Sequence, residues 1–387
     1  MTMPIRQRSA SSRARVVVVG AGGNIGSHLV SHLGRMEHVR EVVLIDRGKY
    51  ELSNLVSQDV TSREVGRRKA VVQANRLRRI NPALVVRWHA EPAEDVPLGC
   101  LRGDVLLACL DSRAARQFVN QAARRLGMPW IDAGVYADGL LAQVSAYASE
   151  PGQPCLECAW DDRDYAALQQ TYSCGGIATE PPATGAPSSL GALAAALQAL
   201  ECRKLLAGAL DRVAFGRQVL IDASGHKQYV TAFRRNAACR MPEHRPWSIR
   251  RFRHRLEDAT VEQLLALRRG VHEADRLTLR VAGRAFVTQL TCPTCGYGRP
   301  LLRLAGAHGP ARGRCAACGV SMVVAGFDVR DRVSVAELST ALRSRSLRSL
   351  GLRHGDVFTI AGAAGDLHYA IDGGVPPIGS DTRRATE

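Results

Sequence analysis

Short, continuous apolar runs alternate with helical periodic patterns through about the first 135 residues. Continuous runs of this kind are typical of parallel strands covered on both faces, and regular strand–helix alternation is typical of an α/β sheet. The expected strands are 16–20, 41–46, 83–90, 104–111 and 128–135, and the expected helices are 24–35, 66–82 and 112–127. The pattern therefore predicts an α/β fold with a doubly wound, mostly parallel, Rossmann-like sheet.

The pattern changes after this region. Residues 141–147 and 218–235 look like antiparallel strands, and they predict an antiparallel extension of the sheet, with a helix at 190–206 between them. An Arg-rich polar stretch at 244–254 predicts a domain boundary. We expect a flexible basic tail at 1–14, a first domain at 15–245, a second domain at 246–372 and a disordered tail at 373–387.

The composition indicates a cytoplasmic protein. The N-terminal stretch is basic and lacks the apolar segment of a secretory signal. The longest apolar helix candidate contains Gln198, Glu201, Arg203 and Lys204, which excludes a membrane span. The chain has eleven cysteines, which we expect to be reduced or metal-bound rather than paired in disulfides.

The net charge of +16 comes mainly from arginine. One interpretation is nucleic-acid binding, but the arginines are scattered and no basic run is interleaved with aromatic residues. We favour an Arg-rich composition with solvated faces, with some contribution to binding nucleotides or an acidic protein partner.

The stretch VVVVGAGGNIGSHL, residues 16–29, predicts a nucleotide site. Glycines at 20, 22 and 23 allow a tight turn and a close approach of the backbone to a phosphate, and Gly26 lets the following helix pack on the strand. The helix N-terminus then offers free N–H groups to an anion. The motif alone does not distinguish NAD, FAD and ATP.

The order of residues beyond this turn is more specific. Asp46 begins DRGKYELSNLVSQ, Lys69 lies in VGRRKA, RINP follows, and Asp111 lies in LACLDSRAARQFVN. Together with the later stretch CGGIATEPPATGAPSSLGALAAALQALECRKLLAG, this order resembles the adenylate-forming activating enzymes of the ThiF, MoeB and HesA family, which are related to ubiquitin-activating enzymes. The resemblance covers about residues 14–245.

The resemblance implies a role for each matching residue. Gly20, Gly22, Gly23 and Gly26 would cradle ATP, Asp46 would hold the ribose, Asn54 and Gln58 would lie near the phosphates, Lys69 would neutralise phosphate charge, and Asp111 would bind magnesium. These roles agree with the chemistry: a carboxylate that attacks the α-phosphorus brings two anions together, so a lysine and a metal must offset their repulsion.

Two positions depart from the family pattern. Gly48 stands where a second acid is usual, and Ser57 stands where an arginine usually precedes the glutamine. The missing arginine removes a positive charge from the phosphate site. Arg47, Arg113, Arg116 or an arginine from the basic tail of a second subunit are candidates to replace it.

A first CxxC pair, Cys155 and Cys158, is either redox-active or half of a zinc site. No thioredoxin-like unit surrounds it, which favours zinc. The resemblance implies a second ligand pair near the end of the first domain, where the chain reads NAACRMPEH. We therefore predict a zinc site of Cys155, Cys158, Cys239 and His244, the alternative being a free Cys239 and a chance histidine.

Two CxxCG motifs in the second domain predict a zinc ribbon at 292–318. The ligands are Cys292, Cys295, Cys315 and Cys318, and four thiolates leave no open position for a substrate, so this zinc is expected to be structural. These pairs could instead complete the first zinc site, but a self-contained ribbon is simpler. The stretch 347–362 beyond the ribbon predicts a short helix, a turn and a strand.

Cys174, in TYSCGG, is a candidate thiol acceptor. Some relatives use a cysteine in this neighbourhood to take the activated acyl group or sulfur, and others have one there without such a role. Cys100, Cys109 and Cys202 have apolar surroundings and are expected in the core.

The resemblance thus implies ATP- and Mg-dependent adenylation of a carboxylate with release of pyrophosphate, by a homodimer. The carboxylate would be the C-terminal glycine of a ubiquitin-like or sulfur-carrier protein, or a small carboxylate substrate. Two alternatives remain: an NAD(P)-dependent oxidoreductase, which leaves Lys69 and Asp111 without roles, and a noncatalytic zinc-containing scaffold or nucleic-acid binder.

Overall fold

The computed structural model describes residues 14–170, 185–241, 244–268, 277–305, 313–363 and 365–371. The described residues form two compact units. The first contains residues 14–96 and 101–247, and the second contains residues 97–100 and 248–371. The tails expected at 1–14 and 373–387 lie outside the described residues, except for Ala14, which begins the first strand.

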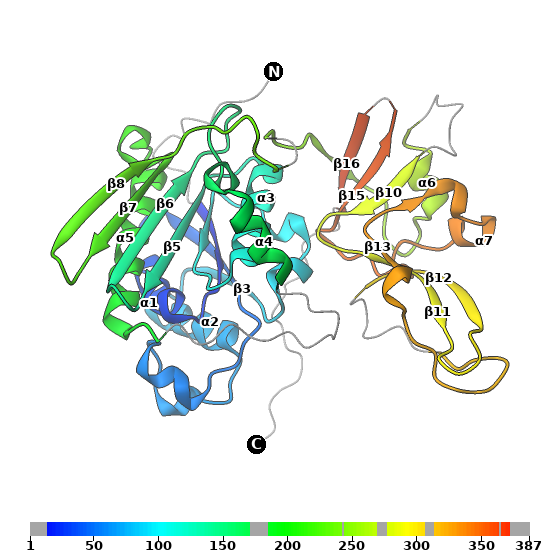
Figure 1. Ribbon diagram of the computed structural model, residues 1–387, viewed down its shortest axis with the longest axis horizontal. Helices are drawn as coiled ribbons and strands as arrows, with labels where there is room; N and C mark the ends of the chain where they lie inside the picture. Colours follow the sequence, from blue (N-terminus) through cyan, green and yellow to red (C-terminus); the bar gives the residue numbers. More distant parts are fainter. Residues whose placement is uncertain are drawn as a thin grey trace. The chain divides into compact units, whose positions relative to one another are not determined.

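The first unit is built on an eight-stranded sheet with the order β3-β2-β1-β4-β5-β6-β7-β8 (Figure 1). Its parallel strands are β1 (Ala14–Val19), β2 (Val39–Ile45), β3 (Val85–His89), β4 (Val105–Ala108) and β5 (Trp130–Tyr136). Its antiparallel strands are β6 (Leu141–Tyr147), β7 (Arg217–Asp222) and β8 (Lys227–Ala232). The predicted doubly wound sheet with an antiparallel extension is confirmed.

Helices cover both faces of this sheet. They are α1 (Asn24–Leu33), α2 (Lys69–Ile80), α3 (Arg113–Leu126), α4 (Asp162–Gln170) and α5 (Ser188–Leu206). Along β5, Ile131 and Ala133 belong to the core cluster that α1 and α5 share, whereas Asp132 between them binds Arg116 of α3. Because successive side chains of a strand point to opposite faces, α3 lies on the face opposite α1 and α5.

Local signals set the ends of α3. The Ser112 hydroxyl accepts a hydrogen bond from the Ala115 amide at 3.2 Å, and Gly127 ends the helix with a φ of 66°. Both are residue types that favour these positions.

Short 3-10 helices of this unit are η1 (Leu52–Val56), η2 (Ser62–Glu64), η3 (Ala93–Asp95), η5 (Leu156–Ala159) and η6 (Leu210–Arg212).

The second unit contains two sheets. The five-stranded sheet has the order β14-β10-β15-β16-β9, with β9 (Ile249–Phe252), β10 (Thr278–Val281), β14 (Val333–Ser334), β15 (Val357–Gly362) and β16 (Gly365–Ile371). The three-stranded sheet has the order β12-β11-β13, with β11 (Phe286–Thr291), β12 (Gly298–Leu304) and β13 (Val329–Arg330). Its helices are α6 (Val261–Leu265), α7 (Thr340–Arg343), η4 (Leu98–Leu101), η8 (Gly326–Asp328) and η9 (Val335–Glu337).

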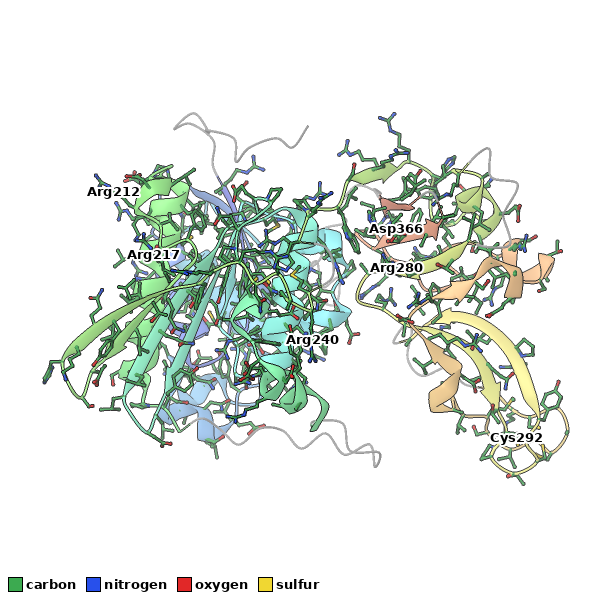
Figure 2. The ribbon with its side chains drawn as sticks, turned by 45° about the horizontal axis from the view of Figure 1, so that its top comes forward. Arg212, Arg217, Arg240, Arg280, Cys292 and Asp366 are labelled. Carbon is green, nitrogen blue, oxygen red and sulfur yellow. The ribbon has the colours of Figure 1, made fainter. Side chains whose placement is uncertain are left out.

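Ion pairs join the strands of the five-stranded sheet. Arg280 of β10 pairs with Asp366 of β16, and Figure 2 labels both residues. Arg284 donates to the fully buried Asp356 at 2.9 Å. A buried charge is tolerated only when it is paired, so this contact fixes the loop before β15 against the end of β10.

The short helix expected near residue 347 is wrong. Residues 347–351 form turns, and Gly351 has a φ of 88°, which does not fit a continuing helix. The expected strand that follows is confirmed as β15. Within the described ranges, no helix is both long and apolar enough to cross a membrane.

Candidate active site and metal clusters

Backbone atoms leave no room for a side chain at Gly20, in the loop between β1 and α1, or at Gly26, in the first turn of α1. A Cβ at Gly20 would lie 2.2 Å from the Cys109 carbonyl oxygen, and Gly20 also has a φ of 79°. A Cβ at Gly26 would lie 2.1 Å from the Gly20 carbonyl oxygen. Both neighbours are backbone atoms, so the loop keeps this close-packed shape only with glycine. It presents the N-terminus of α1, an anion-binding feature, at the carboxyl edge of the sheet.

Asp46 ties the end of β2 to this loop. Its carboxylate accepts the Gly22 amide at 2.8 Å and the Gly48 amide at 2.9 Å. Each carboxylate oxygen retains a second acceptor site, so Asp46 can still receive hydroxyl donors.

Lys69 is held beside the same loop by a short antiparallel ladder. Its amide donates to the Gly48 carbonyl at 2.9 Å, and the Tyr50 amide donates to the Arg67 carbonyl at 2.9 Å. A Cβ at Gly22 would lie only 2.4 Å from Cβ of Lys69. The lysine stem therefore lies against Gly22, and the structure brings together the Gly-rich loop, Asp46 and Lys69.

Asn54, Gln58 and Asp111 are placed less directly. The Asn54 side chain accepts the Glu51 amide at 3.0 Å and so caps η1. Gln58 Oε1 is buried and has no hydrogen-bond partner in the described part of the chain. Asp111 is exposed in the loop after β4, two residues beyond the carbonyl that closes on Gly20. Cys174 lies outside the described residues.

Two of the arginines considered as substitutes at Ser57 are already engaged. Arg116 donates to the buried Asp132 at 3.1 Å and to the Leu110 carbonyl at 2.7 Å, so it serves the sheet rather than a phosphate. Arg113 pairs with Asp164 of α4. Arg47 follows Asp46 directly at the end of β2, and the basic tail, the fourth source considered, lies outside the described residues.

Gln198 of α5 is a structural residue that the sequence did not reveal. It is fully buried, and its amide donates to the carbonyls of Ala108 at 3.0 Å and Ile131 at 2.8 Å. The Cys109 thiol donates to its oxygen at 3.2 Å, and burial raises the pKa of this thiol. Gln198 therefore secures β4 and β5 next to the nucleotide site, and Cys109 is a core residue as expected.

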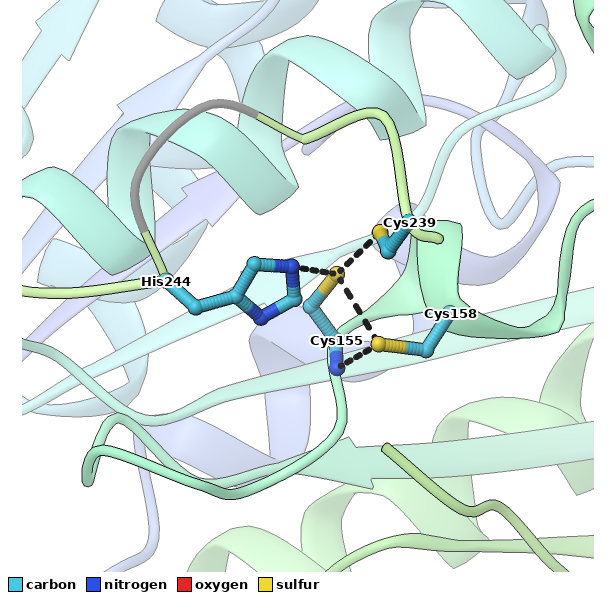
Figure 3. A group of neighbouring side chains, drawn as sticks. All are labelled: Cys155, Cys158, Cys239 and His244. Carbon is cyan, nitrogen blue, oxygen red and sulfur yellow. Dashed lines mark hydrogen bonds between the residues drawn. The ribbon is translucent and has the colours of Figure 1, made fainter. Parts of the chain in front are cut away.

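The first metal cluster gathers Cys155, Cys158, Cys239 and His244 (Figure 3). Their four candidate ligand atoms all lie within 4.8 Å of one another. Cys155 Sγ lies 3.8 Å from Cys158 Sγ, 3.8 Å from Cys239 Sγ and 3.8 Å from His244 Nε2. The sequence-predicted residues are thus adjacent in space, although 89 positions separate the first from the last.

A buried carboxylate anchors this cluster to α3. Glu157 lies between the two cysteines of the first pair and is 1% exposed. It accepts hydrogen bonds from Gln117 at 2.9 Å, Asn120 at 3.2 Å and Tyr165 at 3.2 Å. The CxxC turn is therefore bonded to α3 and α4, and a hydrogen-bonded buried carboxylate does not act as an unpaired charge.

Positive charge lies beside the thiols. Arg235 Nη1 is 3.6 Å from Cys158 Sγ, and the hydrogen bond between the two thiols lowers the pKa of Cys158 while it raises that of Cys155. A thiolate is the form that binds a metal. Arg240 pairs with Asp162 and lies 4.5 Å above the Tyr165 ring, which holds the loop after Cys239 against α4 (Figure 2).

The second cluster occupies the three-stranded sheet of the second unit, where Figure 2 marks Cys292. Two equivalent turns carry its four cysteines. The Cys292 amide donates to Tyr297 O at 2.9 Å, and the Cys315 amide donates to Val320 O at 2.8 Å. Each turn closes with a glycine at a φ of 72°, which explains the glycine after each CxxC.

The spacing of the sulfurs fits tetrahedral zinc rather than disulfides. Zn–S bonds of about 2.3 Å place tetrahedral sulfurs about 3.8 Å apart, whereas a disulfide needs about 2.05 Å. Sulfur separations are 3.4, 3.5 and 3.7 Å in the second cluster and 3.8 Å in the first. Both donor sets, three thiolates with one imidazole and four thiolates, fit structural zinc.

Comparisons with known proteins concern the first unit. The model of a family described as "ThiF family" matches residues 3–241. The sulfur carrier protein ThiS adenylyltransferase of Escherichia coli (strain K12) is 31% identical over 232 residues, which are 58% of this chain and 84% of that protein. The sulfur carrier protein adenylyltransferase of Thermus thermophilus is 31% identical over 244 residues, which are 59% of this chain and 81% of that protein.

A crystal structure of E. coli MccB resembles the fold. It is 19% identical to this chain with a TM-score of 0.50, and the match covers 64% of this chain and 69% of that chain. The family match ends at residue 241, and of the second unit it includes only residues 97–100.

Proposed function

Because this chain belongs to the ThiF family, we propose that it is an ATP- and Mg-dependent adenylyltransferase. It activates a carboxylate, the C-terminal glycine of a ubiquitin-like or sulfur-carrier protein, and releases pyrophosphate. The observation that carries this proposal is the meeting of Lys69, Asp46 and the Gly-rich loop at one edge of the sheet. The names of the E. coli and Thermus relatives support the substrate class.

In this proposal a carboxylate oxygen attacks the α-phosphorus and the bond to the pyrophosphate oxygen breaks. The loop amides and the N-terminus of α1 hold the triphosphate, and Lys69 offsets the repulsion between the two anions. Asp46 receives the ribose hydroxyls through its remaining acceptor sites. Positioning and charge supply most of the rate enhancement, since the reaction needs no covalent group from the protein.

The remaining site residues are assigned by the same proposal. Asp111 binds magnesium, because its exposed carboxylate follows β4 beside the loop. Gln58, whose buried oxygen has no partner among the described residues, and Asn54 lie on the phosphate side. The Cys174 thiolate attacks the acyl carbon of the adenylate, so that a thioester forms and AMP leaves, or the adenylate passes to a separate sulfur donor.

We assign zinc to both cysteine clusters. Each fills its four positions with protein ligands, so the metal stabilises the fold and takes no part in adenylation.

We also assign a homodimer to this chain. Leu52 and Val56 of η1 are 72% and 78% exposed. The next residue is Ser57, at the position where the family usually has an arginine. Apolar side chains this exposed are explained by a partner surface, and a second copy then brings the arginine that Ser57 does not provide.

The test is pyrophosphate–ATP exchange with the full-length chain and a carrier protein that ends in glycine. Lys69→Met removes the ammonium and keeps the stem against Gly22, so the exchange rate should fall at least about a hundredfold. Lys227→Met, a lysine on the exposed strand β8, is the matched control and should exchange as wild type. Exchange that persists in Lys69→Met would refute the assignment of the site.

The oxidoreductase alternative finds no support in these relatives, whose names are those of adenylyltransferases. The scaffold alternative predicts that the folded wild type binds neither ATP nor a carrier, and the exchange assay distinguishes it directly.

A further inference from the structure

Tyr50 is buried directly beside Lys69. The lysine Nζ lies 5.4 Å from the centre of the Tyr50 ring, within the range of a cation–π contact, and the tyrosine is 1% exposed. A Cβ at Gly22 would lie 3.0 Å from the Tyr50 hydroxyl oxygen. The ring therefore touches both the cation and the Gly-rich loop that the cation serves.

The orientation of the ring is fixed from the helix that carries the lysine. Gln73, one turn after Lys69 in α2, is fully buried, and its Nε2 donates to the Tyr50 hydroxyl at 2.7 Å. The backbone of Tyr50 is held by the Arg67 carbonyl and the Gly66 amide. Because the ring is bonded at its tip and at its backbone, it cannot turn away from the lysine without breaking these contacts.

Gly48 provides the space for this arrangement. A Cβ there would lie 3.2 Å from Cδ and 3.4 Å from Cε of Lys69. With no side chain at Gly48, no acid pairs with the ammonium from this position, and the ring becomes its neighbour. The two departures from the family pattern, Gly48 and Ser57, remove one negative and one positive charge from the residues that this chain itself brings to the site.

We propose that Tyr50 is a positioning residue for adenylation, whose ring holds the Lys69 ammonium toward the ATP phosphates. The backbone ladder and Gly22 fix the start of the lysine side chain, and the glycine at position 48 leaves its far end without a side-chain neighbour there. The ring attracts the ammonium without neutralising its charge, so the full charge stays available to the phosphates. This proposal rests on the proposed ATP site and names how that site positions Lys69 without an acid at position 48.

A double-mutant cycle on ATP affinity tests this inference. The full-length wild type, Tyr50→Leu, Lys69→Met and the double variant are titrated with ATP and magnesium by calorimetry, and each protein's melting temperature is recorded without ligand. Tyr50→Leu should weaken ATP binding about three- to tenfold in the wild-type background. In the Lys69→Met background it should weaken binding less than about twofold, because the cation through which it acts is absent. Tyr50→Phe keeps the ring and should bind ATP within about twofold of wild type.

Equal losses in both backgrounds would overturn the inference, because Tyr50 would then act through the fold alone. If Tyr50→Leu does not fold, phenylalanines carrying increasing numbers of fluorine atoms at position 50 replace it, since they weaken the ring's attraction for a cation and keep its shape. Affinity that falls with each fluorine supports the inference, and constant affinity refutes it. A wild type that binds no ATP refutes the proposed function, whereas ATP binding with an additive cycle refutes only the role of Tyr50.

Discussion

Replacing Gln198 with leucine should destabilise the first unit at the strands that support the nucleotide loop. The glutamine is fully buried and donates two hydrogen bonds, to the carbonyls of Ala108 and Ile131. Leucine has nearly the same volume and no donors. The change therefore removes the bonds and leaves the packing almost intact.

The expected loss follows from these two bonds. Each net hydrogen bond contributes about 1 kcal/mol, and a buried carbonyl left without its donor adds to the cost, so the free energy of unfolding should fall by about 2 to 3 kcal/mol. For a unit of this size, such a loss lowers the melting temperature by about 4 to 12 °C. The Cys109 thiol also loses its acceptor, a smaller effect because a thiol is a weak donor.

Tryptophan fluorescence measures this unit alone, because all four tryptophans, at 88, 130, 160 and 247, lie in it. Urea and thermal unfolding of Gln198→Leu are compared with wild type and with Gln228→Leu, a change on the exposed strand β8. The control should stay within about 0.5 kcal/mol of wild type. If Gln198→Leu is equally stable, the two bonds contribute nothing and this reasoning is wrong.

Three further predictions concern metal, pH and the loop. Mass spectrometry should find two zinc ions per wild-type chain, and one in each of the variants Cys239→Ser and Cys295→Ser. Only Cys239→Ser should change the tryptophan fluorescence, because the tryptophans lie in the first unit. Two ions in either variant would contradict the ligand sets. Burial lowers the pKa of His28, so the unfolded chain binds this proton more readily than the folded chain as the pH falls below 6.5. The wild type should therefore lose stability between pH 7 and pH 5, and His28→Gln should lose less. Urea unfolding midpoints at the two pH values measure the difference. Gly26→Ala should unfold more easily and lose the stabilisation by ATP, because its Cβ would lie 2.1 Å from a backbone oxygen. Gly23→Ala should melt as wild type, because the nearest atom to its Cβ lies at 3.6 Å. Equal melting temperatures of the two variants would show that the backbone moves to accept the methyl group at Gly26.

Much of the first unit could be predicted because its signals are local. Apolar runs and helical periodicity lie within single elements, and each expected strand and helix of the sheet is present with ends shifted by a few residues, as for α2, which begins at Lys69 rather than at Gly66. Spacing within CxxC pairs is also local. The partners Cys239 and His244 needed the resemblance, since no short motif joins them to Cys155.

The residues that the sequence did not reveal act through contacts between distant segments. Gln198 looked like a polar break in an apolar helix, yet it bonds to strands about 67 and 90 positions earlier. In the sequence, Glu157 is only a residue between two cysteines. In the structure, its hydrogen bonds to Gln117 and Asn120 of α3 hold the CxxC turn in place. The role of Tyr50 could not be predicted, because the residues it contacts, Lys69 and Gln73, belong to the later helix α2.

The fold of the second unit could not be predicted in detail, because its strands also pair with segments distant in the sequence. Its sheet pairs β9 with β16, the first and last strands of the unit, and the ribbon interrupts the chain between β10 and β14. Short strands with such distant partners carry little local signal.

The proposed function requires that the Gly-rich loop and Lys69 hold ATP. The most direct test is a thermal-shift titration, followed by tryptophan fluorescence, of wild type and Lys69→Met with ATP and magnesium and separately with NAD⁺. A ligand that binds only the folded unit raises its melting temperature in proportion to the logarithm of its concentration. ATP should stabilise the wild type and stabilise Lys69→Met much less, and NAD⁺ should stabilise neither protein. Stabilisation by NAD⁺ with no response to ATP would contradict the proposed function.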